Sequence, residues 1–173
     1  MIKNTFKKHI FSFLLTIFIS IYSVNSQNAN EVLIYADEIF YDKDNNLIGK
    51  GKARILFENQ IINSDLIIYN KDTKKIIIPK NFKYKDEQNN LFYGTEGSFD
   101  TSFTNGFIKD VKILLNDGSR IVGSKFQREE NIDIISKGVY SPCSSRIKIG
   151  NFICPTWQLE GRKILHDNNS LLL

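Results

Sequence analysis

The sequence predicts an all-β fold, a sandwich, roll or barrel, for the part of the chain that follows residue 27. Short segments alternate apolar and polar residues with a period of two, as at Ala53, Ile55 and Phe57. Stretches rich in Asn, Asp, Gly and Lys interrupt these segments about every 10 to 16 residues, a spacing typical of strands joined by turns. No long stretch has the i, i+3, i+4, i+7 apolar spacing of a helix.

The first 26 residues have the three parts of a secretory signal peptide. Residues 1–9 carry three lysines and no acidic residue, residues 10–24 are apolar apart from three serines and a threonine, and short residues follow at 24–26. The apolar run is shorter than the roughly 20 residues that a membrane-spanning helix needs. We therefore expect residues 1–26 to be cleaved after export, with an uncleaved membrane anchor as the alternative.

Cleavage would change both the charge and the redox environment of the protein. It removes three of the 23 basic residues and none of the 19 acidic residues, so the mature chain is nearly neutral. A neutral chain gives no reason to expect a nucleic-acid partner. Export implies an oxidising compartment, in which Cys143 and Cys154 become candidates for a disulfide.

The expected strands begin at about residue 31 and follow one another between turns. The first strand, at 31–35, is expected to be an exposed edge of the sheet. Val32, Ile34 and Ala36 mark its apolar face. Turn residues are found at 42–46, 58–59, 70–73, 86–90, 104–106 and 116–118.

One strand pattern occurs twice in the sequence. LIYADEIFYD at 33–42 and INSDLIIYN at 62–70 align with an offset of 28 residues, so that Asp37 matches Asp65. The repeat unit is a pair of strands with two turns, at 33–60 and 61–88, with weaker copies at 93–97 and 120–124. Repeated strand pairs are expected to stack when no single pair can bury its own apolar face.

The sequence gives little support for an enzyme. His166, beside Asp167, is the one histidine outside the expected signal peptide, and no nucleophile accompanies it. Gly49-Lys50-Gly51 lacks the remaining residues of a nucleotide-binding loop. Two cysteines and one histidine do not make a zinc site. We therefore predict a binding or structural role, with no catalytic residue, no metal and no cofactor.

The repeat resembles the organic-solvent-tolerance (OstA-like) domain of lipopolysaccharide transport proteins. The matching segments are ADEIFY at 36–41, GKGKARI at 49–55 and INSDLIIY at 62–69. The resemblance covers roughly residues 31–140. It implies a β-jellyroll that stacks edge to edge with its neighbours across the periplasm and guides lipopolysaccharide acyl chains along an apolar groove.

The C-terminal residues resemble one branch of this family, the outer-membrane lipopolysaccharide-assembly protein (LptD). YSPC at 140–143, CPTWQL at 154–159 and His166-Asp167 are similar to the segment that closes its N-terminal jellyroll. The expected domains are therefore a jellyroll at 27–142 and a closing segment at 143–173 that would lead into a missing β-barrel. A free-standing periplasmic bridge protein is the alternative within the family.

The resemblance also implies disulfides, because jellyroll cysteines in that branch pair with cysteines of the barrel. Two alternatives stay open for this chain. Cys143 and Cys154 pair with each other, or both pair with another segment or chain.

The resemblance places the lipid-facing strands just before the motif aspartates and on the alternating apolar face. The residues expected to line the groove on this basis are Val32, Ile34, Ala36, Ala53, Ile55, Phe57 and Ile62. The expected partners are lipopolysaccharide, a bridge protein that adds to the N-terminal edge strand, and the outer-membrane barrel with its lipoprotein plug where these are present. The expected location is the periplasm at the inner side of the outer membrane. The rival hypothesis is a structural β-domain that binds only protein.

Overall fold

The computed structural model describes residues 32–142, 148–149, 152–153 and 157–167. The expected signal peptide and both cysteines, Cys143 and Cys154, lie outside the described residues. Within the described ranges the backbone is strand, turn or loop, and none of it is helical, which confirms the all-β prediction. The described residues accordingly contain no helix that is both long and apolar enough to span a membrane.

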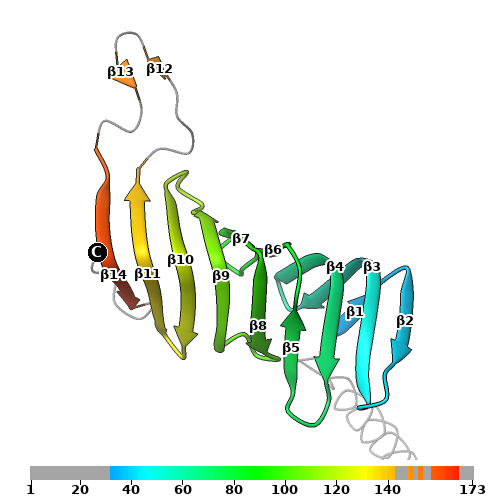
Figure 1. Cartoon of the computed structure of the whole chain (residues 1–173). Coiled ribbons are helices and arrows are strands. Elements are labelled where there is room, and N and C mark those ends of the chain that lie inside the picture. The colour runs from blue at the N-terminus through cyan, green and yellow to red at the C-terminus, as the bar shows by residue number, and fades with distance from the viewer. Residues whose placement is uncertain (1–31, 143–147, 150–151, 154–156, 168–173) are drawn as a thin grey trace, which may run out of the picture.

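Apart from β12 and β13, which pair only with each other, the described strands stand side by side in a row that runs from β1 and β2 at one end to β14 at the other (Figure 1). Their bounds are β1 Leu33–Tyr35, β2 Glu38–Tyr41, β3 Asn46–Phe57, β4 Gln60–Asn70, β5 Lys75–Ile78, β6 Phe82–Lys85, β7 Leu91–Gly94, β8 Glu96–Asp100, β9 Asn105–Leu114, β10 Arg120–Glu129, β11 Ile132–Ser141, β12 Lys148–Ile149, β13 Phe152–Ile153 and β14 Leu159–Asp167. All the pairings between them are antiparallel.

The sheet divides in its middle and closes on itself. β4 pairs with β6 along residues 61–64 and with β5 along 68–70. β9 pairs with β8 along 106–109 and with β7 along 112–114. Because β5 also pairs with β8 and β6 with β7, the six strands form a closed ring. The ring is the central section of a roll, and β1 to β3 extend it at one end while β10, β11 and β14 extend it at the other.

A line of irregular residues, here called the crease, crosses the strands at one level. In β3 the register shifts between Lys50 and Ala53, and Lys52 has a φ of 44°. Asp110 in β9 and Lys137 in β11 both have a φ of 49°. Such bulges bend a strand. The crease therefore separates a first arm (β1, β6, β7 and the adjoining halves of the long strands) from a second arm (β2, β5, β8 and the other halves).

The crease explains the repeat in the sequence. Asp37 separates β1 from β2, and its N–H donates to the carbonyl of Gly51 across the bulge of β3. Asp65, its partner in the repeat, lies opposite the same bulge in β4. The weaker copies also reach the crease, where Thr95 bonds to Asp110 and Ser124 lies opposite it in β10. The repeat thus marks the place where each strand passes from one arm to the other.

The inner angle of the crease accepts only small side chains. A Cβ on Gly49 would lie 3.3 Å from the Cβ of Ala36 and 3.7 Å from that of Ala53. A Cβ on Gly94 would overlap Cγ2 of Ile108. The two arms converge here, so glycine and alanine are needed where large residues could pack farther out.

The hairpin turns share one construction, in which one of the two residues before the next strand has a left-handed backbone. In the turns at 42–46 and 86–90 an aspartate accepts hydrogen bonds from the N–H and side-chain amide of the asparagine four residues later. The predicted turn at 104–106 lies instead at 101–104, because Asn105 already begins β9. There the left-handed residue is Phe103, with a φ of 57°.

Candidate functional site: the interior of the roll

The centre of the roll is filled by seven aromatic side chains, here called the aromatic cluster. Neighbouring rings have centroids 5.2 to 6.3 Å apart, and no member is more than 6% exposed. Several of these contacts join the two arms, such as Phe92 of β7 with Phe126 of β10. The members are Phe57, Phe82, Tyr84, Phe92, Phe99, Phe103 and Phe126.

The seven residues predicted to line a groove all face this interior. Ala53, Ile55, Phe57 and Ile62 are buried core residues, and Val32, Ile34 and Ala36 are partly buried and pack against them. The structure thus brings the whole predicted set together on one face. Their contact with lipid stays a prediction.

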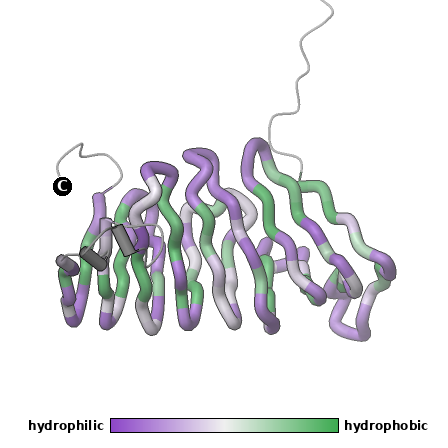
Figure 2. Tube along the Cα trace, turned by 90° about the horizontal axis from the view of Figure 1, so that it is seen from above, coloured by the Kyte–Doolittle hydropathy of each residue, from purple (hydrophilic) through white to green (hydrophobic). Residues whose placement is uncertain are grey.

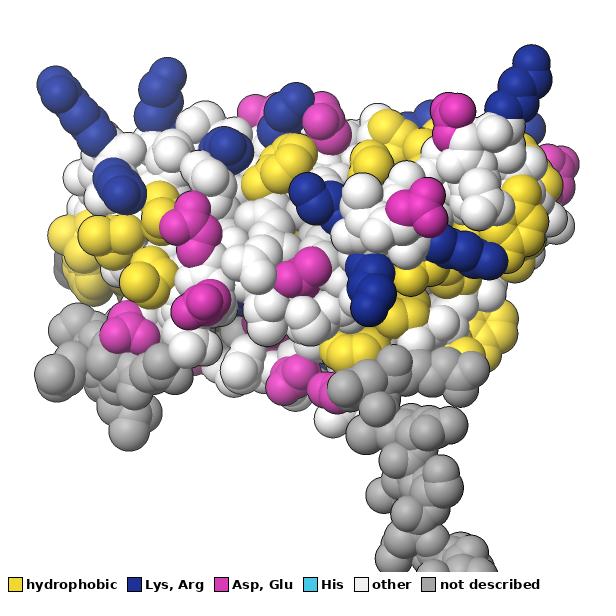
Figure 3. Space-filling model, turned by 90° about the horizontal axis from the view of Figure 1, so that it is seen from below, with side chains coloured by type: hydrophobic (Ala, Val, Ile, Leu, Met, Phe, Trp, Pro, Cys, Tyr) yellow, Lys and Arg dark blue, Asp and Glu magenta, His cyan; other side chains and the backbone are white. Residues whose placement is uncertain are grey.

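At both ends of the row, residues that face the interior become accessible. Ile39 of β2 lies opposite Gly49 on the inner face and is 49% exposed. At the other end Leu159 of β14 lies opposite Tyr140 and is 60% exposed, and the ring of Trp157 is 6.0 Å from that of Tyr140. Hydrophobic side chains gather toward both ends in the space-filling view (Figure 3). The apolar interior is therefore open at its ends and closed in its centre.

The outer surface follows the alternation that the sequence predicted. In strands such as β9, apolar and polar residues alternate over most of the length, and polar residues dominate the turns (Figure 2). Arg54 of β3 points outward and donates to Asn63 at 3.0 Å, while its neighbours Ala53 and Ile55 are buried. One face of such a strand is exposed to water, and the other packs against an apolar core or ligand.

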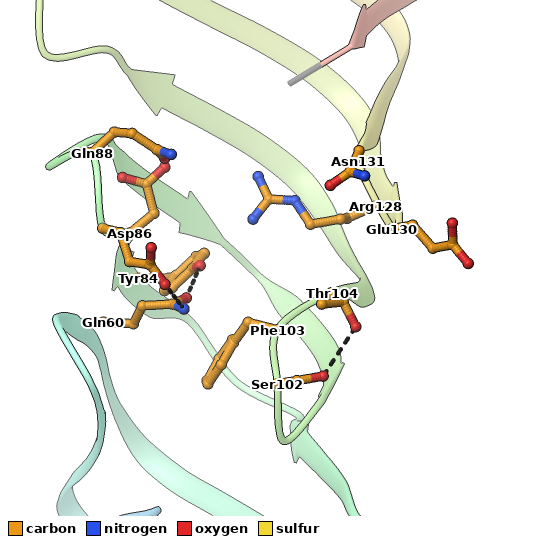
Figure 4. Close-up of a pocket in the computed structure, with 11 residues that line it drawn as sticks. Gln60, Tyr84, Asp86, Gln88, Ser102, Phe103, Thr104, Arg128, Glu130 and Asn131 are labelled. Carbon is orange, nitrogen blue, oxygen red and sulfur yellow. Dashed lines mark hydrogen bonds between the residues drawn. The ribbon is translucent and has the colours of Figure 1, made fainter. Parts of the chain in front are cut away.

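Next to the aromatic cluster, a polar pocket of about 170 Å³ lies between the turns of the two arms (Figure 4). We call this pocket the mouth. The hydroxyl of Tyr84 donates to Oε1 of Gln60 at 2.5 Å, and Nε2 of Gln60 donates to Glu87 at 2.9 Å. These residues belong to the first arm. The second arm contributes the turn residues around Phe103 and the hairpin that carries Arg128.

Arg128 is a cation of the mouth, with a side chain that is 15% exposed. Its Nε and Nη2 donate to the two carboxylate oxygens of Asp133 at 2.7 and 2.9 Å. Burial alone would lower the pKa of Arg128, but the hydrogen bonds and charge of Asp133 outweigh this and raise it. Burial raises the pKa of Tyr84 so far that the hydroxyl stays neutral, although the charge of Arg128 acts in the opposite direction.

Asp86 is a buried acid at the same mouth. Burial raises its pKa above 3.8, and the hydrogen bonds from Asn90 and the charge of Arg128 offset only part of this. A carboxyl with a raised pKa binds its proton more tightly in the folded state. Its contribution to the free energy of unfolding is therefore largest below pH 3.8 and is lost as the pH rises through the raised pKa.

We expect Asp86→Asn to remove this part of the pH dependence. The amide keeps an oxygen that accepts from the N–H of Asn90 but cannot ionise. The free energy of unfolding of the variant, relative to that of the wild type, should therefore increase as the pH rises above 3.8. Urea unfolding at several pH values up to neutrality measures the difference. A constant difference between the two proteins would show that Asp86 has an ordinary pKa.

Sequence reasoning missed most of the aromatic cluster and the residues that line the mouth. Phe82, Tyr84 and Phe92 follow the period-two pattern and could have been placed on an inner face. Phe103 and Arg128 could not, because their roles depend on which turns and hairpins face each other across the roll. Among the described residues no three His, Cys, Asp or Glu side chains are grouped so that they could hold a metal ion.

Comparison with known proteins gives a structural likeness and no sequence match. No family model and no curated protein matches this chain. Among solved structures the roll is similar to LptH, described as the LptA-homologous periplasmic component of the lipopolysaccharide transport device of Pseudomonas aeruginosa. The TM-score is 0.50 at 15% identity, over 60% of this chain and 78% of LptH. The likeness confirms the predicted β-jellyroll fold that the repeat indicated.

Proposed function

We propose that this protein is a non-enzymatic, periplasmic carrier of lipopolysaccharide, whose acyl chains pass through the interior of the jellyroll. The observation that carries the proposal is the apolar interior, which is continuous across the row of strands and accessible at both ends. The fold shared with LptH supports it, because that protein is a periplasmic component of a lipopolysaccharide transport device.

The chemistry of the interior suits a carrier. Each acyl methylene moved from water into an apolar environment gains about 0.8 kcal/mol, which is enough to keep a chain inside. An interior of similar aliphatic and aromatic residues provides many near-equal positions rather than one deep minimum. A chain can then be displaced by the next one, and the energy for directed movement comes from another protein.

The finer proposal is that the chain acts at the outer membrane, as the jellyroll of the LptD branch does. The YSPC and CPTWQL segments support it, and the contact between Tyr140 and Trp157 joins these two segments in the structure. The barrel, its lipoprotein plug and the disulfides of Cys143 and Cys154 are part of this proposal. A free-standing bridge protein remains the alternative.

We further propose that a bridge protein adds a strand at the N-terminal end. β1 and β2 both pair with β3, and no other described strand pairs with them. An edge strand of this kind presents unpaired N–H and C=O groups to a partner. A partner strand at this edge would bring its own apolar face next to Ile34 and Ile39. The same edge also suits the rival function, a structural domain that binds only protein.

The expected result that separates a lipid carrier from a protein-binding domain is a difference between two adjacent residues of β2. Ile39 and Phe40 are 49% and 45% exposed, but Ile39 faces the interior and Phe40 the outer surface. A photo-crosslinking amino acid at Ile39, in the exported full chain, should give lipopolysaccharide adducts on a blot. The same amino acid at Phe40 should give few or none.

A second pair repeats the comparison closer to the predicted groove. Ile34 packs against the core, and Arg54 lies on the outer face of the neighbouring strand. Adducts at Ile34 without adducts at Arg54 are expected. Equal labelling of inner and outer positions, or none at any of the four in a folded and exported protein, would contradict a lipid conduit and favour the protein-binding domain.

A further inference from the structure

We propose that Phe103 is a gate residue, whose ring closes the central section of the roll and must leave it before an acyl chain can pass. This inference rests on the proposed function, because a gate has meaning only if acyl chains use the interior. It adds a specific moving part to that function.

Phe103 is the one member of the aromatic cluster whose backbone is not in a strand. The other six belong to β3, β6, β7, β8 and β10, where ladder hydrogen bonds fix their positions. Phe103 lies in the turn between β8 and β9, and its side chain is nevertheless only 3% exposed. A strand residue cannot leave the interior without breaking its ladder, whereas a turn residue can.

The ring of Phe103 joins the two arms across the mouth. It stacks on Tyr84 with centroids 5.5 Å apart and an interplanar angle of 14°, and it lies 5.8 Å from Phe57. Both partners are on the first arm, while Phe103 belongs to the second arm and also contacts Phe99 there. The ring therefore occupies the space between the arms in which an acyl chain would have to lie.

The backbone of Phe103 is left-handed, a conformation that a bulky residue rarely adopts. Equivalent residues in three other turns, each with its N–H bonded to the carbonyl three residues earlier, are Asn45, Asn89 and Gly118. These are the residue types that accept a left-handed backbone, and a phenylalanine at a φ of 57° is strained. Strain of this kind persists only where the surroundings hold it, and it is concentrated at functional sites.

Hydrogen bonds within the turn also hold it together, so that it can shift as a unit. Asp100 accepts hydrogen bonds from the N–H and hydroxyl of Thr104 and from the N–H and side-chain amide of Asn105. Ser102 bonds to Thr104. Within the described chain, the hydrogen bonds of residues 101–104 all end inside 100–105, so ring contacts are what hold this turn to the first arm. Next to the ring, the pocket of about 170 Å³ gives it room to shift.

The test measures the affinity of the full chain for cis-parinaric acid, a fluorescent fatty acid. Phe103→Asn places in the turn the residue that its backbone prefers and removes the ring from the interior. We expect it to bind the fatty acid about tenfold more tightly, as when a binding-competent state that is populated at about one tenth becomes dominant. Phe103→Leu should give a smaller gain.

A matched control distinguishes a gate from any cavity in the core. Phe92→Leu makes the same change in the same cluster, but on a strand. It should leave the affinity within about twofold of the wild type, because its backbone position is fixed. An equal gain in Phe92→Leu, or no gain in the Phe103 variants, would overturn the proposal.

A second measurement does not depend on the stability of those variants. In a chain with Cys143→Ser and Cys154→Ser, Phe103→Cys is labelled with iodoacetamide with and without the fatty acid. Faster labelling with the fatty acid is expected, and unchanged or slower labelling would contradict a gate. If Ile39 gives lipopolysaccharide adducts while these results are negative, the gate fails and the conduit stands. If Ile39 also gives none, both fail.

Discussion

Arg128→Met should destabilise the roll by about 4 kcal/mol, the loss expected when one partner of a buried ion pair is removed. The Arg128 and Asp133 side chains are only 15% and 9% exposed, and two hydrogen bonds of 2.7 and 2.9 Å join them. The variant keeps the apolar stem of the arginine but leaves the Asp133 carboxylate buried without these bonds. Urea unfolding followed by circular dichroism measures the change.

The double variant Arg128→Met with Asp133→Leu is the control for this prediction. Replacing both members of a buried pair with apolar residues is often neutral, so the double variant should recover most of the loss. An Arg128→Met variant within about 1 kcal/mol of the wild type would show that the pair is effectively a surface ion pair. The comparison also tests whether the second-arm side of the mouth is as dry as its burial indicates.

Gly94→Ala should cost about 3 kcal/mol, near the upper end of what overpacking a core costs. The added Cβ would overlap Cγ2 of Ile108 and lie 2.9 Å from Cε1 of Phe82. Both neighbours are buried in strands on opposite arms, so neither can retreat without opening the crease. The midpoint and the slope of a urea titration measure the loss and show whether the folded state remains compact.

Gly161→Ala is the matched control in β14. The nearest atom to its added Cβ is the carbonyl oxygen of Lys163 at 3.4 Å, an ordinary contact. We expect a change within about 1 kcal/mol, since the site has room and alanine has less conformational freedom to lose on folding. Equal effects at Gly94 and Gly161 would contradict the view that the two arms meet in a narrow angle at the crease.

The local patterns in the sequence were sufficient for the fold class. Alternation at Ala53, Ile55 and Phe57 predicts a strand with one buried face, and the structure buries all three. The turns at 42–46 and 86–90 were predicted from their composition, because an aspartate and a following asparagine bond within the turn itself. The turn at 101–104 was misplaced because its left-handed residue is a phenylalanine, which gives no local turn signal.

The predicted groove residues all face the interior of the roll, but they are only part of the residues that do so. Period-two alternation identifies a shared face and does not say what lies opposite it. Phe99 and Phe126 reach the same interior from strands distant in sequence, and Tyr84 meets Gln60 across the first arm. The sequence also could not show that the centre is closed by rings while Ile39 and Leu159 at the two ends remain exposed.

The sequence by itself determined the strands, most turns and the repeat, because these depend on neighbours in the chain. Only the tertiary structure decided that Asp37 and Asp65 mark a crease, that β4 and β9 each divide between two partners, and that Phe103 and Arg128 meet the first arm at the mouth. These features arise from pairings between residues far apart in the chain. The physical reason is that an alternating strand specifies which face is apolar, while the long-range register specifies what that face encloses.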